Sequence, residues 1–318
     1  MGTQQMLLGG GIPDPTDINI YIPAKWGTNN ATGATVSTYY TNATKNHYSG
    51  QKSNTFHETH FSRVGDGILS FQLPAATYQF EAKSGGGSGT YSWGGSKIDS
   101  ATLTLSSATD ILVLIPNHGL AAYAGGGGFF LIAGTDYTSA YNVPIFILGG
   151  GGGGYQYNND WCKPGDLSAN NLNSSRRGSS EGYGGNYDGG AGFLDTYTVK
   201  VHAGSNRAKH FVQGGSGGTF TGCASTGFGG FGGGGGSCPG GGGGVRGGYA
   251  GTDGHNNGPG NGGSQWWNGA HMGGGGGTSY YNTTYVSNIV NEDTGSTNST
   301  HYSSINATHG GYFGIYTV

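Results

Sequence analysis

The stretch that decides the fold is residues 227–248, GFGGFGGGGGSCPGGGGGVRGG, where a few other residues interrupt a long run of glycine. Glycine loses more backbone freedom on folding than any other residue. Such a run is therefore either a flexible linker or a structure that packs through its backbone. The choice matters for function, because a linker only tethers its neighbours, whereas a rigid glycine layer can present a surface.

The position of the run favours packing. Most of the glycine lies in one block, about residues 184–277, which has apolar strand patterns before it and the closing pattern YFGIYTV at residues 312–318 after it. The block therefore sits inside one domain. Aromatic residues make up 12% of the 318-residue chain, and Pro-rich or charge-rich blocks of the kind that keep chains expanded are missing from the sequence.

A packed glycine run has a well-defined conformation available to it, the polyproline II helix, with three residues per turn and a rise of about 3.1 Å per residue. This helix has no internal hydrogen bonds, so its N–H and C=O groups must bond to neighbouring chains. The sequence therefore predicts a bundle of polyglycine II helices. The aromatic residues Tyr155, Phe228, Phe231 and Tyr249 are expected to plug the edges of the bundle or to reach its surface.

Outside the block, alternating and continuous apolar runs predict strands, and no segment keeps a helical period over three turns. The predicted class is all-β. Residues 111–115 form a continuous apolar run that predicts a strand covered on both faces. Residues 18–22 alternate and predict a strand with one buried face. The other predicted strands are 68–73, 78–83, 101–105, 129–133, 143–148, 193–201 and 312–318.

Charge and motifs exclude several classes of function. The formal net charge is −3, and the sequence has no cluster of Lys and Arg residues that could neutralise phosphates. Both features argue against nucleic-acid binding. No apolar run approaches the roughly 20 residues of a membrane span. The sequence carries neither a nucleophile elbow nor a phosphate-binding GK[ST] loop, so we expect no enzyme and no cofactor.

Histidine and cysteine spacing predicts no metal site. His57 and His60 are three residues apart in a segment without helix signals, and in a strand two such side chains point to opposite faces. We therefore interpret this segment as a solvated loop and not as a metal site. Cys162, Cys223 and Cys238 match no zinc framework. A bond between Cys223 and Cys238 would close the glycine tract between them and contribute about 3 kcal/mol. Cys162 would then remain free or buried.

Aromatic-polar segments are the candidate binding sites. They combine Tyr and Trp with Asn, Ser and Gly, which is typical of recognition surfaces, because a rigid aromatic ring gives contact area at a low entropy cost. An equally weighted interpretation is that these residues cap a glycine bundle that has few other side chains to cover it. The candidates are Tyr155, Tyr157, Trp161, Gln265, Trp266, Trp267, Tyr280 and Tyr281.

Asn-x-Ser/Thr triplets begin at Asn30, Asn42, Asn173, Asn282, Asn298 and Asn306. Asn, Ser and Thr are so abundant here that chance alone accounts for about this many triplets. They therefore do not establish a glycosylated secreted protein.

The order of these elements resembles a known family. LSFQLPAATYQFEAKSGGGSG (69–89), AGGGGFFLIAG (124–134), VPIFILGGGGGG (143–154) and GFGGFGGGGGSCPGGGGG (227–244) are similar to the glycine-rich domain of the anaplastic lymphoma kinase and leukocyte tyrosine kinase receptors. Related domains occur in bacteriophage tail and fibre proteins. The resemblance implies a β-sandwich of tumour-necrosis-factor type with an inserted polyglycine II bundle, and it supports pairing of Cys223 with Cys238.

The chain departs from those receptors, since residues 1–318 contain neither a kinase nor a membrane span. Its start, MGTQQMLLGGG, has an initiator Met without signal-peptide features and is more similar to a phage virion protein. We therefore expect a non-enzymatic protein of a phage tail fibre or tail tip that contacts a host receptor or glycan. The alternatives are an extracellular secreted or surface binding domain and a purely structural filament subunit.

The expected organisation has three parts. Residues 1–15 form an arm that docks to other virion proteins, residues 16–65 an N-terminal β segment, and residues 66–318 the glycine-rich sandwich domain with its insertion at about 184–277. A homo-oligomer is expected, and trimers are common among fibres and among sandwiches of this type.

Overall fold

Nearly all regular structure in the described part of the chain is β. The computed structural model describes residues 18–24, 32–33, 35, 60–89, 94–120, 124–139, 141–154, 167–168, 189–194, 206, 208–221, 226–236, 240–245, 247–248, 276–293 and 310–318. Among these residues the helical structure amounts to one short 3-10 helix, η4 (Phe211–Gln213), and isolated residues. The predicted all-β class is confirmed.

Two large sheets face each other, and a small hairpin accompanies them. The five-stranded sheet has the order β1 (Asn19–Pro23), β14 (Tyr312–Thr317), β4 (Ala76–Lys83), β5 (Lys97–Leu105) and β13 (Val286–Asp293). The seven-stranded sheet has the order β2 (Ser62–Val64), β3 (Ile68–Leu73), β6 (Thr109–Leu114), β7 (Phe129–Ala133), β8 (Val143–Leu148), β12 (Ser279–Tyr281) and β9 (Leu167–Ser168). The hairpin is β10 (Thr219–Thr221) with β11 (Thr226–Phe228). Pairing is antiparallel except between β12 and β9.

Alternation of apolar and polar residues determines which face of β4 points into the core. Tyr78, Phe80 and Ala82 are fully buried, whereas the residues between them are half-exposed, as period-two spacing requires. The prediction for β1 was wrong in one respect, because this strand is buried on both faces. Asn19 and Tyr21 are 8% and 4% exposed, and the Tyr21 ring lies 5.8 Å from that of Tyr312 on β14.

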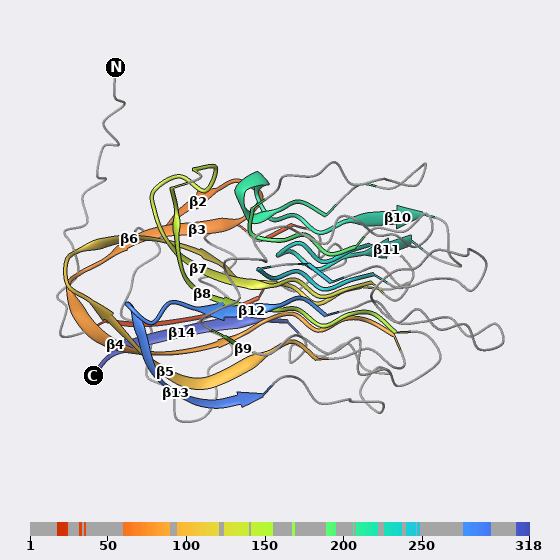
Figure 1. Cartoon of the computed structure of the whole chain (residues 1–318). Helices are drawn as coiled ribbons and strands as arrows, with labels where there is room; N and C mark the ends of the chain where they lie inside the picture. Colours follow the sequence, from red (N-terminus) through yellow and green to blue (C-terminus); the bar gives the residue numbers. More distant parts are fainter. Residues whose placement is uncertain are drawn as a thin grey trace, which may run out of the picture.

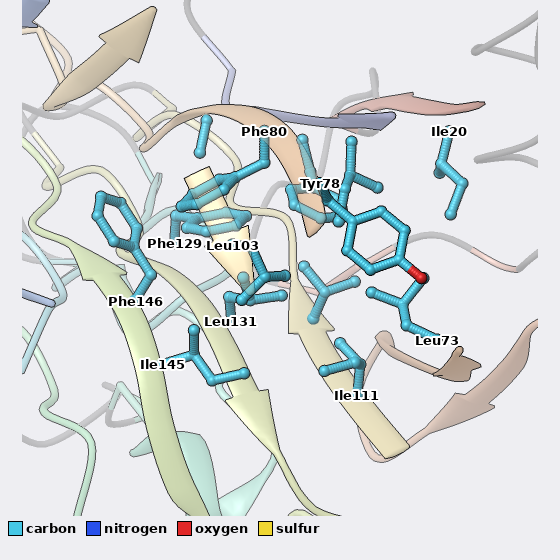
Figure 2. Packing of buried hydrophobic residues seen from close by; sticks show 14 of the residues in the cluster. Ile20, Leu73, Tyr78, Phe80, Leu103, Ile111, Phe129, Leu131, Ile145 and Phe146 are labelled. Carbon is cyan, nitrogen blue, oxygen red and sulfur yellow. The ribbon is translucent and has the colours of Figure 1, made fainter. Parts of the chain in front are cut away.

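The main core lies between the two sheets. The Phe80 and Phe146 rings, one from each sheet, meet edge to face at 5.2 Å, and the Phe129 and Phe313 rings stack at 5.7 Å. Figure 2 shows side chains of β4, β6, β7 and β8 converging in this layer. Such interlocking aromatic and aliphatic packing between two sheets is what stabilises a β-sandwich.

A second core covers the outer face of the seven-stranded sheet. Along β6, Ile111 and Val113 belong to the main core, whereas Leu112 and Leu114 belong to the second one. Both faces of this strand are therefore buried, as the continuous apolar run predicted. The outer cover comes from the glycine-rich block, which contributes Phe193, Phe211, Phe231 and Val245.

The sandwich has two distinct ends. β4 and β8 run directly into glycine-rich segments at 84–89 and 149–154, so both strands point toward the same end. β14 is antiparallel to β4, and β1 is antiparallel to β14. Thr317 and Ile18 therefore lie at the opposite end, where Thr317 N–H bonds to the Ile18 carbonyl at 2.9 Å. In Figure 1 the glycine-rich segments extend to the right and the C-terminus lies to the left.

A buried phenol makes this fold sensitive to alkali. Tyr78 Oη donates to the Pro74 carbonyl at 2.8 Å, and burial raises the pKa of Tyr78 from 10.0 to about 12. The folded chain keeps this proton where the unfolded chain loses it. The resulting stability is complete below pH 10 and is lost as the pH rises through 12.

We predict that the wild type loses about 2 kcal/mol more unfolding free energy than Tyr78→Phe between pH 9 and pH 12. Urea unfolding of both proteins at these pH values measures the difference. Parallel losses in the two proteins would contradict the prediction.

Candidate functional site

Several glycine-rich segments lie together at one end of the sandwich, and we call them the glycine body. Four of them continue strands of the two sheets: 84–89 follows β4, 124–128 precedes β7, 149–154 follows β8 and 276–278 precedes β12. The remaining segments are 117–120, 189–193, 215–218, 229–236, 240–245 and 247–248. The body therefore contains glycine runs from outside residues 184–277 as well as from inside that block.

The segments of the body bond to one another through the backbone, and the donors repeat every three residues. The N–H groups of Gly150 and Gly153 donate to one neighbouring segment, whereas those of Gly151 and Gly154 donate to another. The bonds are Gly150 to Gly243 at 2.7 Å, Gly153 to Gly240 at 2.9 Å, Gly151 to Gly85 at 3.0 Å and Gly154 to Ser88 at 3.2 Å.

The same spacing recurs in four further segments. In each case two N–H groups three residues apart donate to a single partner segment, while the residues between them face elsewhere. The pairs are Gly125 to Gly235 with Gly128 to Gly232, Gly85 to Gly127 with Ser88 to Ala124, Asn117 to Phe231 with Leu120 to Phe228, and Gly190 to Gly248 with Phe193 to Val245. A chain that turns once every three residues presents its donors in this way.

The close approach of these backbones requires glycine. A Cβ on Gly127 would overlap the carbonyl oxygen of Phe231, and one on Gly125 would overlap that of Gly241. Both obstacles are backbone atoms that are themselves held in the bonded array, so neither can move aside by a change of rotamer. Packing in the body is therefore set by the missing side chains.

Three buried serines join the glycine body to both sheets, and we call them the serine junction: Ser84, Ser96 and Ser279. Ser84 Oγ donates to the Gly149 carbonyl at 2.6 Å and also lies 3.2 Å from the Ser96 carbonyl. Ser279 Oγ accepts from the Gly149 N–H at 2.9 Å and lies 3.4 Å from Ser96 Oγ. The hydroxyls satisfy the N–H and the carbonyl of Gly149, the residue that follows β8, where the sheets give way to glycine. No sequence motif pointed to this cluster.

Loss of one junction hydroxyl is predicted to be costly. Ser84→Ala should lower the unfolding free energy by about 1–2 kcal/mol, because a buried carbonyl loses its hydroxyl partner. Ser139→Ala is the matched control, since its hydroxyl accepts an N–H bond in an exposed loop, and its effect should stay below about 0.5 kcal/mol. Denaturant unfolding compares the two, and equal effects would contradict the prediction.

Phe231 occupies a different place from the one expected. It is fully buried in the second core, between the glycine body and the seven-stranded sheet, and does not plug an edge or reach the surface. Its ring fills the space next to β6 and β7, where glycine offers no side chain. Phe228 is half-buried on β11. Tyr155 and Tyr249 lie outside the described residues.

Two of the predicted binding residues fall in β12. Tyr280 is 6% exposed and belongs to the second core, so its ring has a packing role. Tyr281 is half-buried and packs against the main core. Register pairs them with Ile147 and Phe146 of β8. Alternation along the strand therefore sends the two rings to opposite faces of the sheet.

The other predicted sites lie outside the described residues. These are Tyr155, Tyr157, Trp161, Gln265, Trp266 and Trp267, the three cysteines Cys162, Cys223 and Cys238, and His57. The points at which the chain leaves the glycine body are described. Residues 155–166 follow Gly154, which bonds to Ser88, and residues 249–275 follow Gly248, which bonds to Gly242 at 2.7 Å.

Within the described ranges, His, Cys, Asp and Glu side chains form no group of three or more that could hold a metal ion. The same residues include no helix of the length and apolar character needed to cross a membrane. Comparison of the sequence with protein-family models and with curated proteins finds no match.

Proposed function

We propose that this chain is a non-enzymatic binding protein of a phage tail fibre or tail tip, in which the glycine body holds recognition segments against a host receptor or glycan. The observation that carries the proposal is the three-residue repeat of backbone hydrogen bonds across the body. A backbone-bonded array whose large side chains, such as Phe193 and Phe231, are buried against the sheet is suited to fixing the segments that leave it.

We further propose that the glycine body is a polyglycine II bundle on a sandwich of tumour-necrosis-factor type. The repeat of three supports it, as do backbones too close for a Cβ at Gly125 and Gly127. Amide exchange tests the bundle directly. We expect the amides of Gly125 and Gly153 to be protected well above those of an unstructured peptide. Exchange at the free-peptide rate would contradict the polyglycine II bundle.

The two ends of the sandwich suit a division of roles. The expected arm, residues 1–15, precedes Ile18, which lies at the end opposite the glycine body, and this position fits docking to other virion proteins. Residues 155–166 and 249–275 leave from the body and carry most of the candidate aromatic residues. Attachment at one end and recognition at the other is the arrangement that a tail-tip protein needs.

Host-cell binding tests the recognition role. The double substitution Trp266→Ala with Trp267→Ala should weaken binding at least tenfold, as expected when anchoring aromatic residues are truncated. Tyr141→Ala is the matched control, because Tyr141 is 94% exposed in the β7–β8 loop at the opposite end. Unchanged binding by the folded double variant would remove these residues as recognition groups.

A secreted or cell-surface ligand-binding domain is the second candidate, favoured by the resemblance to the receptor glycine-rich domain. Electron microscopy of phage particles labelled with an antibody against this chain separates the two. Labelling at a tail tip or fibre supports the first proposal. A particle preparation free of the protein would overturn it in favour of the second.

A further inference from the structure

One buried histidine bonds directly to the backbone of the glycine body. His210 is 2% exposed, and its Nδ1 accepts a hydrogen bond from the Gly192 N–H at 3.0 Å. In return, the Phe211 N–H donates to the Gly192 carbonyl at 3.2 Å. The imidazole therefore pairs segment 189–193 with the turn at η4, and it does so through an unprotonated nitrogen.

The segments that His210 joins form the cover over the seven-stranded sheet. The Phe193 and Phe211 rings lie 5.5 Å apart, and they lie 6.4 Å and 5.3 Å from the Phe130 ring on β7. On its other side, segment 189–193 bonds through Ala191 to Gly233 at 2.6 Å. The histidine thus stands where the glycine body, η4 and the second core meet.

The imidazole is buried beside segment 189–193, whose Phe193 belongs to the second core. Tyr280 also belongs to that core, and Tyr137 packs against it. Next to His210 in the sequence, Lys209 forms an ion pair with Asp66 of the β2–β3 turn. The Lys209 Nζ and Asp66 Oδ2 atoms lie 2.9 Å apart. These two charges already neutralise each other at the surface.

We propose that His210 is an acid-sensitive latch between the glycine body and the sandwich. Protonation of Nδ1 replaces the acceptor lone pair with an N–H, so that two donors, Nδ1–H and Gly192 N–H, would face each other. Burial of the side chain, which is 2% exposed, also disfavours a charged imidazolium. The latch therefore holds at neutral pH and opens on acidification.

The direction of the pH effect on latch opening follows from proton linkage. The closed latch excludes the proton that a solvated imidazole binds below about pH 6.5, so the open state takes up one more proton. The equilibrium constant for local opening should rise about tenfold for each pH unit below that value. Above it, opening should be independent of pH.

Amide hydrogen exchange tests the latch in the full chain. The protection factor of Gly192, corrected for the intrinsic rate at each pH, should fall about tenfold per unit from pH 6.5 to pH 5 in the wild type. His210→Asn places an amide oxygen near the Nδ1 position and cannot titrate in this range, so its protection should stay constant. A pH-independent wild type, or the same acid response in His210→Asn, would overturn the proposal.

Two further variants identify the titrating group. His60→Asn removes a half-buried histidine beside β2, and Asp66→Asn removes the carboxylate of the surface pair. Both should retain the wild-type response to acid, and loss of the response in either would assign it to that residue instead. If His210→Asn fails to fold, nitrogen NMR of the wild-type protein can follow protonation of the His210 imidazole directly. Protonation of Nδ1 without loss of Gly192 protection would overturn the latch.

Discussion

Gly127→Ala is expected to abolish the native packing of the glycine body and to lower the unfolding free energy by about 4 kcal/mol or more. The added Cβ would overlap the Phe231 carbonyl oxygen, which already accepts the Asn117 N–H at 3.1 Å. Overpacking against side chains typically costs about 1–3 kcal/mol. Here the obstacle is bonded backbone, and effects above 4 kcal/mol mark such cases.

Two controls accompany this substitution in denaturant unfolding. Gly128→Ala should have a smaller effect, since the nearest atom that its Cβ would meet, the Gly244 nitrogen, is 2.8 Å away. Ala191→Gly removes a methyl group that the body already accommodates, at a cost of about 1 kcal/mol. If Gly127→Ala were no more destabilising than Ala191→Gly, close backbone approach would not be what holds the body together.

Phe231→Ala is expected to lower the unfolding free energy by about 3–5 kcal/mol, the range for truncating a fully buried phenylalanine. This ring belongs to the glycine block yet packs in the second core with Leu112, Leu114 and Phe130 of the sheet. Its removal should loosen the body from the sheet. Faster amide exchange at Gly126 and Gly232 would therefore accompany the loss of stability.

Phe228→Ala is the comparison for this second prediction. The Phe228 side chain is half-buried on β11, while its backbone exchanges hydrogen bonds with Leu120 at 2.7 and 2.8 Å. The substitution leaves those backbone bonds intact and should cost about 1 kcal/mol. Equal losses for Phe228→Ala and Phe231→Ala would show that the second core does not hold the glycine body to the sheet.

The strands were predictable because their signal is local. Alternation at Tyr78, Phe80 and Ala82 and the continuous run at 111–115 depend only on neighbouring residues and on which faces are buried. β1 was misjudged for the same reason. The second face of β1 is buried in the folded chain, and the sequence pattern of residues 18–22 does not indicate this burial.

The candidate site was predictable only in kind. The position of the glycine block between strand patterns indicated a packed body. The body also includes the runs 84–89, 124–128 and 149–154, which lie far from residues 227–248 in the sequence. A glycine has no side chain whose type could reveal its partner, so which segments bond depends on where the strands bring them. Tyr280 was proposed as a contact residue, yet its pairing in β12 buries it.

The sequence by itself determined that the chain is all-β, that residues 111–115 form a strand covered on both faces and that the glycine runs pack. These properties follow from composition and short-range periodicity. Only the tertiary structure decided what covers the seven-stranded sheet, how three serines join the sheets to the glycine body and that His210 accepts a bond from Gly192. The physical reason is that such contacts join residues distant in sequence, and backbone groups and small hydroxyls carry no pattern that names their partners.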